Sequence, residues 1–140
     1  MARTLVKSKQ YVQSAPATVD DSYTGGSYTP GPNGPVLTFT ALGTGQYKVY
    51  TNVALNKAGA STYGLIKVSN TAGGAAVVLE QPVIILDNDV DDWQTQQPFS
   101  YYNLVAGVSY TFQIEAQVTG STLAILYSLL NSTLVAEQVL

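Results

Sequence analysis

The segment from Ser109 to Val118 alternates between polar and apolar side chains at every position. Its apolar members stand two residues apart, and they are Tyr110, Phe112, Ile114, Ala116 and Val118. Successive side chains of a β-strand point to opposite faces of the sheet, so this pattern predicts a strand with one buried face and one face in water. A chain with such a strand needs a β-sheet with an apolar core behind it.

The same period of two recurs across most of the chain after residue 35. Between residues 46 and 55, one face would carry Tyr47, Val49, Thr51, Val53 and Leu55. Further strand-like segments are separated by turn residues, and Pro82 and Pro98 interrupt two of them, because proline cannot donate to a strand ladder. The pattern predicts an all-β fold, an antiparallel β-sandwich or jelly roll of about eight strands. The last segment, "STLVAEQVL", suits a terminal strand and also tolerates a helix.

The strand expected at residues 122–128 raises the question of what covers its second face. Leu123, Ile125 and Tyr127 can continue the core face, which leaves Ala124 and Leu126 on the face where water is expected. Either a second layer of the same chain covers these two side chains, or another chain does. A monomeric sandwich and an oligomer are both open, and we favour the oligomer because a chain this low in charge would otherwise expose apolar patches.

Residues 1–35 differ from the rest in composition. They are rich in Ser, Thr, Gly and Pro and carry little aliphatic mass, which predicts an N-terminal arm with a poorly ordered linker, ahead of a sandwich domain at 36–140. A partner could bury the few apolar side chains of the arm, and its cations could meet an acidic surface. The residues of this docking arm are Arg3, Leu5, Val6, Lys7, Lys9, Tyr11 and Val12.

The composition disfavours several function classes. The chain has no Cys and no His, which removes disulfides, thiol nucleophiles, imidazole bases and the commonest transition-metal ligands, so we expect neither an enzyme nor a cofactor. Residues 1–19 carry three cations and no acid, and three Lys against nine acids leave the remainder at minus six. The sequence has no strongly basic face for nucleic acid and no apolar run long enough to span a membrane. No apolar segment follows the basic start, so a secretory signal is not expected.

The acidic segment "LDNDVDDW" is the most site-like stretch. Asp87, Asp89 and Asp91 alternate as the oxygen ligands of Ca²⁺ often do. An EF-hand loop needs Gly at its sixth position and Glu at its twelfth, whereas here the sixth is not Gly and the twelfth is Pro98. We therefore expect a solvated turn without a metal ion.

Ten Tyr and one Trp would suit a surface that stacks on sugars. Tyr also fills core and interface positions, where its ring is buried and its hydroxyl finds a partner, and we favour this use. Tyr101 and Tyr102 are consecutive, so one of them must leave the core.

The carboxy-terminal part of the chain resembles a module of bacteriophage virion proteins. The segments "NLVAGVSYTFQIEAQ", "STLAILYS" and "STLVAEQVL" are similar to small trimeric jelly rolls of the tumour-necrosis-factor/complement-head type, found in head decorations and fibre tips. The residues that carry the likeness are Leu104, Ala106, Gly107, Tyr110, Thr111, Phe112, Ser132 and Leu134. The likeness covers residues 36–140 and includes no catalytic signature.

The resemblance implies a homotrimer in which neighbouring subunits bury the outer face of one sheet. The residues expected at or near that interface are Ala124, Leu126, Tyr101 and Tyr102. The implied function is that of a non-enzymatic virion structural protein, a capsid decoration or head-fibre-type accessory protein that docks on other virion proteins through its N-terminal arm. A receptor- or glycan-binding fibre tip shares this fold and is the alternative.

Overall fold

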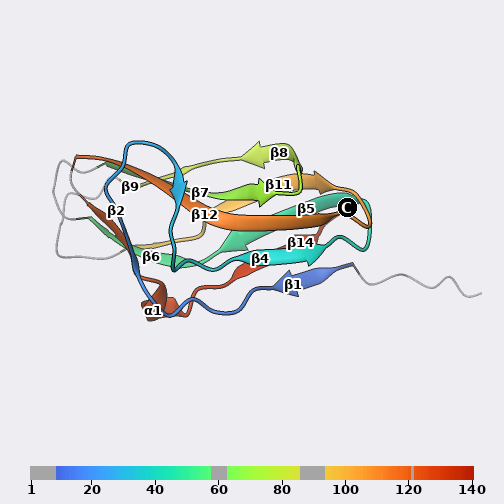
Figure 1. Cartoon of the computed structure of the whole chain (residues 1–140), viewed down its shortest axis with the longest axis horizontal. Coiled ribbons are helices and arrows are strands. Elements are labelled where there is room, and N and C mark those ends of the chain that lie inside the picture. The colour runs from blue at the N-terminus through green and yellow to red at the C-terminus, as the bar shows by residue number, and fades with distance from the viewer. Residues whose placement is uncertain (1–8, 58–62, 86–93, 121) are drawn as a thin grey trace, which may run out of the picture.

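The computed structural model describes residues 9–57, 63–85, 94–120 and 122–140, and its secondary structure is almost entirely β (Figure 1). The described strands are β1 (Tyr11–Gln13), β2 (Asp21–Tyr23), β3 (Thr29–Pro30), β4 (Leu37–Thr40), β5 (Gly45–Thr51), β6 (Val53–Lys57), β7 (Tyr63–Ala72), β8 (Ala76–Glu80), β9 (Val83–Ile85), β10 (Gln94–Gln96), β11 (Phe99–Leu104), β12 (Ser109–Thr119), β13 (Leu123–Ile125) and β14 (Leu134–Gln138). A short helix, α1 (Tyr127–Leu130), lies between β13 and β14. The pairings between these strands are antiparallel, which confirms the predicted all-β class.

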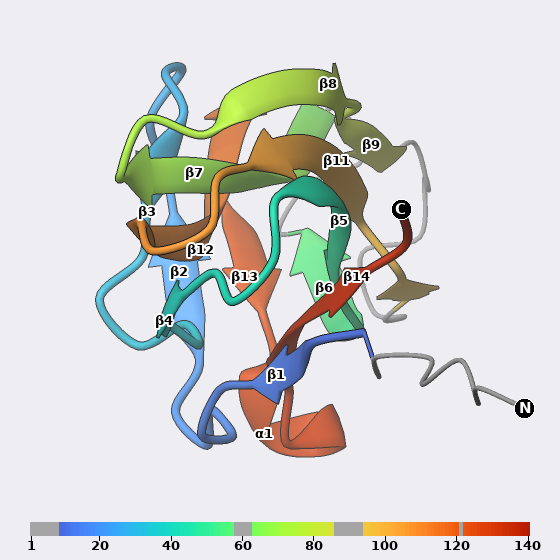
Figure 2. The same ribbon diagram turned by 90° about the vertical axis from the view of Figure 1, so that its right-hand side faces the viewer.

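The strands form two packed layers (Figure 2). One layer contains the sheet β1-β14-β5-β11-β8, which leads into the sheet β10-β6-β13-β2 because β5 runs into β6 after a single residue, Asn52. β10 and β11 make the same step across Gln97 and Pro98. The other layer is the sheet β3-β12-β7-β9, with β4 also paired to β12. Apolar side chains of both layers meet between them, as in other β-sandwiches.

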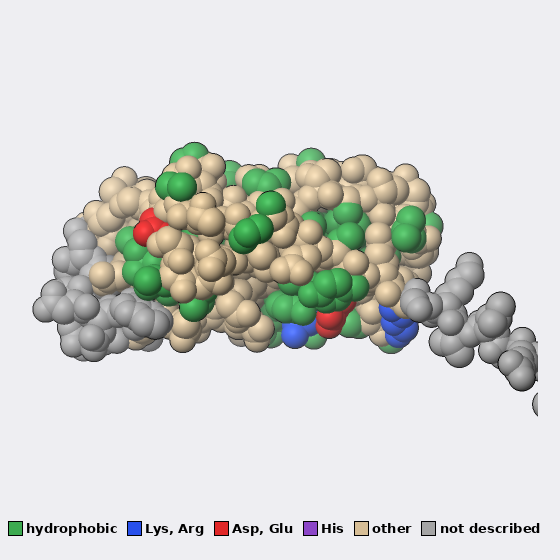
Figure 3. Space-filling view, turned by 90° about the horizontal axis from the view of Figure 1, so that it is seen from below, with side chains coloured by type: hydrophobic (Ala, Val, Ile, Leu, Met, Phe, Trp, Pro, Cys, Tyr) green, Lys and Arg blue, Asp and Glu red, His purple; other side chains and the backbone are tan. Residues whose placement is uncertain are grey.

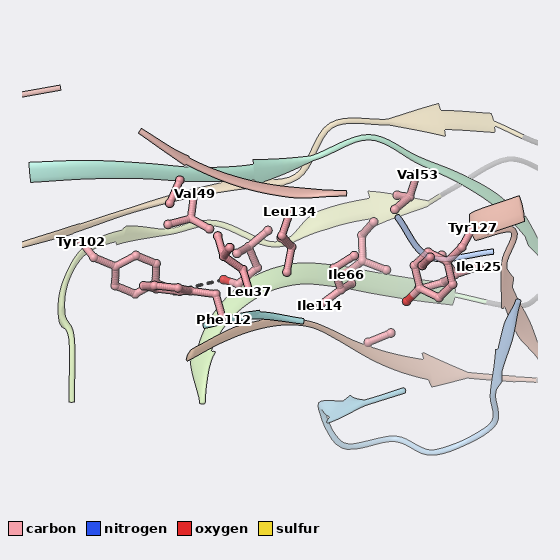
Figure 4. Close-up of a cluster of buried hydrophobic side chains, with 14 of the residues drawn as sticks. Leu37, Val49, Val53, Ile66, Tyr102, Phe112, Ile114, Ile125, Tyr127 and Leu134 are labelled. Carbon is pink, nitrogen blue, oxygen red and sulfur yellow. Dashed lines mark hydrogen bonds between the residues drawn. The ribbon is translucent and has the colours of Figure 1, made fainter. Parts of the chain in front are cut away.

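The core follows the period-two pattern of the sequence. The five alternating apolar residues of β12 are each no more than 3% exposed, and the predicted face of β5 and β6, from Tyr47 to Leu55, is no more than 1% exposed. Figure 4 shows buried side chains from both layers in one row, with Tyr102 toward one end and Tyr127 toward the other. The row fills the space between the sheets along the length of the sandwich.

The strands are shorter and more numerous than predicted. Pro98 separates β10 from β11 and Pro82 precedes β9, as the sequence indicated. β13 ends at Ile125, and the chain then turns into α1 where a strand up to Ser128 was expected. Tyr127 begins this helical turn, yet its side chain still reaches the core and is fully buried. The last segment pairs with β5 as β14, so it forms the terminal strand and not a helix.

The described part of the N-terminal segment is built into the sandwich. β1 pairs with β14 and β2 pairs with β13, so both strands extend sheets of their own chain. Ala17 and Tyr23 are 7% and 6% exposed and belong to the core. A poorly ordered linker was expected here. The difference arises because β13 and β14 offer open edges, and the segment gains main-chain hydrogen bonds by adding to them. Within the described residues, the boundary drawn at residue 35 does not separate an arm from a sandwich.

Three buried tyrosines make the stability of the fold sensitive to alkaline pH. Burial raises the pKa of Tyr23 to about 12, and it also raises the pKa of Tyr102 and of Tyr127 above the ordinary value of 10.0. An unfolded chain releases these phenolic protons near pH 10. Between about pH 10 and about pH 12 the native state therefore binds more protons than the unfolded state, so stability falls as the pH rises.

We expect the free energy of unfolding to drop over this range by on the order of 1–2 kcal/mol for Tyr23 alone. Denaturant titrations at several alkaline pH values measure the drop, and phenolate absorbance reports when the buried rings ionise. Tyr23→Phe should make the pH dependence shallower. A free energy of unfolding that stays constant through this range would contradict the buried state of these hydroxyls.

Candidate interaction surface

The outer face of the sheet β1-β14-β5-β11-β8 carries two rows of side chains that cross all or most of its strands. Residues that lie directly opposite each other in antiparallel strands share a face. The first row is Tyr11, Glu137, Lys48, Tyr101 and Leu79. The second row is Gln13, Val135, Tyr50 and Phe99. The residues that alternate with them, such as Val49 and Tyr102, are fully buried in the core, so both rows point outward. These two rows together are called the aromatic face below.

The side chains of the aromatic face contact one another. The rings of Phe99 and Tyr101 meet edge to face, with their centroids 5.9 Å apart. The Lys48 ammonium lies 5.0 Å from the ring centroid of Tyr50 and 5.5 Å from that of Phe99, within range of a cation–π interaction. The Tyr50 hydroxyl donates a long hydrogen bond of 3.5 Å to Glu137 Oε2. Burial, and then the Glu137 carboxylate, raises the pKa of Tyr50 and keeps this hydroxyl protonated.

The aromatic face continues to a free edge of the sheet. Tyr11 is 56% exposed and Leu79 is 40% exposed, while the rings between them are half-buried. No described strand pairs with the outer edge of β8, where Val77 and Val78 are 59% and 46% exposed. Native sheets usually protect such an edge with charged side chains or proline. Val77, Val78 and Leu79 provide neither. An apolar face that joins an unprotected edge is typical of an interaction surface.

Charge is scarce elsewhere on the molecule too. In Figure 3, which shows one long side, few Lys, Arg, Asp or Glu side chains appear among hydrophobic and neutral polar atoms. The ion pair between the described residues Lys67 and Glu80, at 2.7 Å, is partly buried. Glu80 also accepts a hydrogen bond of 2.8 Å from the Tyr102 hydroxyl, so the pair ties β8 to β7 and β11. The charges of Lys67 and Glu80 therefore stabilise the fold and contribute little to the recognition of a partner.

The predicted interface residues fall in three different places. Tyr101 lies on the aromatic face, as one of the two consecutive tyrosines had to leave the core. Tyr102 is fully buried, and its hydroxyl also donates to the Val68 carbonyl oxygen at 3.1 Å, so its placement at a subunit interface was wrong. A side chain without exposed surface cannot contact a neighbouring subunit. Ala124 and Leu126 lie away from the aromatic face, on β13 and at the start of α1.

Ala124 and Leu126 are both half-buried. Ala124 is paired with Asn56 on one side and Ser22 on the other, so polar neighbours of its own chain flank it on the outer face of this sheet. The backbone N–H of Leu126 donates to the Ala54 carbonyl oxygen at 2.8 Å where β13 gives way to α1. The chain itself thus covers part of the face that the sequence left open.

The residues of the predicted docking arm also fall in different places. Arg3, Leu5, Val6 and Lys7 lie outside the described residues. Lys9 is exposed and donates to the Val139 carbonyl oxygen at 2.9 Å, while Tyr11 joins the aromatic face and Val12 packs against the core. The acidic residues Asp87, Asp89 and Asp91 also lie outside the described residues, and the solvated turn without metal stays a prediction.

Several residues of the aromatic face were not predicted from the sequence. Lys48 and Tyr50 alternate with the predicted core face of residues 46–55, whereas no face was predicted for Phe99 or Glu137. The described residues contain no group of three or more His, Cys, Asp or Glu side chains placed to hold a metal ion. In the same part of the chain, no helix has the length and apolar character needed to cross a membrane.

Comparisons with known proteins support the fold and nothing finer. No family model matches the chain, and no curated protein matches it in sequence. Among solved structures, murine APRIL is similar, with a TM-score of 0.53 and 15% identity over 94% of this chain and 100% of that chain. The Eiger TNF of S. frugiperda has a TM-score of 0.48 and 14% identity over 96% and 94% of the two chains. A carbohydrate-binding module of Cellvibrio mixtus lichenase 5A has a TM-score of 0.36 and 12% identity over 94% and 98%. The likeness to APRIL, together with the antiparallel sheets, confirms the jelly-roll fold.

Proposed function

We propose that the chain is the subunit of a homotrimeric, non-enzymatic structural protein of a virion, of the capsid-decoration or head-fibre type. The observation that carries the proposal is the aromatic face, which joins an unprotected sheet edge on a surface poor in charge. The sequence resemblance to small trimeric jelly rolls of bacteriophage virion proteins supports the virion assignment. The trimer would work by shape, as a rigid module added to the outside of a particle.

The physical argument rests on what burial of the aromatic face would gain. Large rings contribute strongly to interfaces because they bury a large area while losing little side-chain freedom. Lys48 is held over two rings and Glu137 lies near Tyr50, so these charges could enter an interface with partners already in place. A closed ring of three copies could cover this surface without leaving an open end for further growth.

The first prediction from this proposal is the mass of the assembly. Light scattering coupled to size exclusion should give about three times the 14.8 kDa chain mass. Tyr101→Lys places an unpaired ammonium in the proposed interface and should weaken association about tenfold or more. Gln113→Lys is the matched control, because Gln113 is half-buried on the outer face of β12 in the other layer.

The control and one further variant make the result specific. Gln113→Lys should remain a trimer with an unchanged Tm. Leu126→Lys tests the surface at β13 that the sequence suggested. Dissociation of Leu126→Lys with an intact Tyr101→Lys trimer would move the interface to that surface. A monomeric wild type at micromolar concentration would contradict the proposed assembly.

The second prediction concerns docking on the particle through the N-terminal arm. Deleting residues 2–8 removes Arg3, Leu5, Val6 and Lys7 but keeps β1, so the protein should still fold and form trimers yet fail to load onto particles. Deleting residues 2–19 also removes β1 and Ala17, so it should lower the Tm and is the less specific test. Co-sedimentation with particles that lack the protein measures loading. Normal loading of the shorter deletion would assign docking to the sandwich.

A receptor- or glycan-binding fibre tip is the second candidate. The observation in its favour is the Tyr11 ring, which is 56% exposed and could stack on a sugar ring. A glycan array probed with the wild type and with Tyr11→Ala separates the two candidates. We expect no glycan to bind. Saturable binding that Tyr11→Ala abolishes would favour the fibre tip.

A further inference from the structure

A single residue ties the loop between β3 and β4 to a buried carboxylate. Asn33 donates its backbone N–H to both oxygens of Asp21 at 3.2 Å. Its side-chain Nδ2 donates to Asp21 Oδ1 at 3.0 Å and to the Asp20 carbonyl oxygen at 3.2 Å. Asp21 is 5% exposed, and within the described part of the chain the hydrogen bonds to its carboxylate all come from Asn33. Because a buried carboxylate needs donors, this loop depends on Asn33 acting as one.

The loop covers polar groups of the core. The buried hydroxyls of Tyr23 and Tyr127 face each other beneath it, and each affects the pKa of the other. Gly31 passes so close that a Cβ at this position would overlap Asp21 Oδ2 and the Tyr23 hydroxyl. On its outer side the loop forms one wall of a groove of about 380 Å³, and residues 15–19 form the other wall. The loop therefore seals the core and shapes the groove.

The residue after Asn33 is Gly34, and this pair favours chemical change. A glycine peptide nitrogen has no adjacent side chain to hinder it, and its backbone is free to turn toward the preceding amide. Asn33 is exposed, so water and base reach it. We propose that Asn33 is a modification site, at which deamidation turns the donor that holds the loop into an acceptor that repels it.

The reaction needs water and no other reagent. The peptide nitrogen of Gly34 loses its proton and bonds to Cγ of Asn33, the Cγ–Nδ2 bond breaks, and ammonia leaves. Water then opens the cyclic imide at one of its two carbonyl carbons, which gives aspartate or isoaspartate at this position. In the net reaction, one amide and one water are converted into one carboxylate and one ammonium ion. No group is oxidised or reduced.

The product places a carboxylate where an N–H group donated to Asp21 at 3.0 Å. An ionised carboxylate this close to the buried carboxylate of Asp21 repels it strongly. The other groups that face this point are the Asp20 backbone carbonyl and the two neutral tyrosine hydroxyls, and the charges that act on Tyr23 are those of Asp21 and Glu115. The loop is therefore expelled from Asp21, the Tyr23 and Tyr127 hydroxyls meet water, and the groove loses a wall. The change does not reverse spontaneously, so the fraction of molecules with an expelled loop increases as the protein ages.

Peptide mass spectrometry on the intact protein, aged at mildly alkaline pH, measures the modification directly. The peptide containing Asn33 should be the first to gain the mass difference between an amide and an acid. Asn131 is also exposed but is followed by Ser132, and it serves as the internal comparison, which should convert several-fold more slowly. An unchanged Asn33 after Asn131 has converted would overturn the proposal.

Asn33→Asp tests the structural consequence without ageing. At neutral pH its Tm should lie several degrees below that of the wild type, and its buried phenols should ionise at lower pH. Below about pH 4 a protonated carboxyl can donate to Asp21 again, so the difference in Tm should disappear. A variant too unstable to fold at neutral pH should therefore fold in acid. Asn52→Asp, at an exposed position between β5 and β6, is the control and should show neither effect. If Asn33→Asp keeps the wild-type Tm and pH profile, the loop does not depend on the donor.

Discussion

A strand of alternating side chains can bury only one of its faces, and this constraint organises the whole molecule. β12 pairs with β3, β4 and β7, and β5 pairs with β11 and β14, so each of these two strands lies at the centre of its own layer. Their inward positions form the core. Their outward positions are then fixed as well, because Tyr47 and Val49 cannot face inward unless Lys48 and Tyr50 face outward. The aromatic face is thus a consequence of the same alternation that builds the core.

The few charges of the described residues are largely used within the subunit. Lys67 pairs with Glu80, and Lys48 lies over two rings of its own sheet. Asp21 is held by the neighbouring loop, without a cation among the described residues. A surface of this kind has little charge with which to steer a partner or to keep other copies apart. Association through matching apolar shape is the mode of recognition that such a surface supports.

The sequence predicted the core better than the edges. Local alternation predicts which side of β12 or β5 is buried, since that depends only on neighbouring residues. It could tell that one of Tyr101 and Tyr102 leaves the core, but the register of β11 against β5 was needed to tell which one. The N-terminal segment was misjudged for a related reason. Its proline and glycine content indicates a loop, whereas Tyr23 and Ala17 are buried because distant strands offer open edges to the segment.

The aromatic face could not be predicted for the same reason, because it depends on contacts between distant segments. Tyr50, Phe99 and Glu137 lie far apart in the sequence, and only the pairing of three strands brings them together. Alternation places Tyr50 opposite the core face and predicts no face for Phe99 or Glu137, so no local pattern marks these residues as part of a site. Ala124 attracted attention because it breaks the local pattern, and the structure flanks it with polar residues of its own chain. Cross-strand register, which sequence alone does not supply, is therefore what defines the aromatic face.

The burial of the aromatic face between copies is the central claim, and thiol labelling tests it most directly. The chain has no cysteine, so the Tyr101→Cys and Gln113→Cys variants each carry a single thiol. With the protein concentrated enough to assemble, the thiol of Tyr101→Cys should react much more slowly than that of Gln113→Cys, and dilution should remove the difference. Equal labelling rates of the two thiols at every protein concentration would show that the aromatic face stays open to solvent, and would contradict the account.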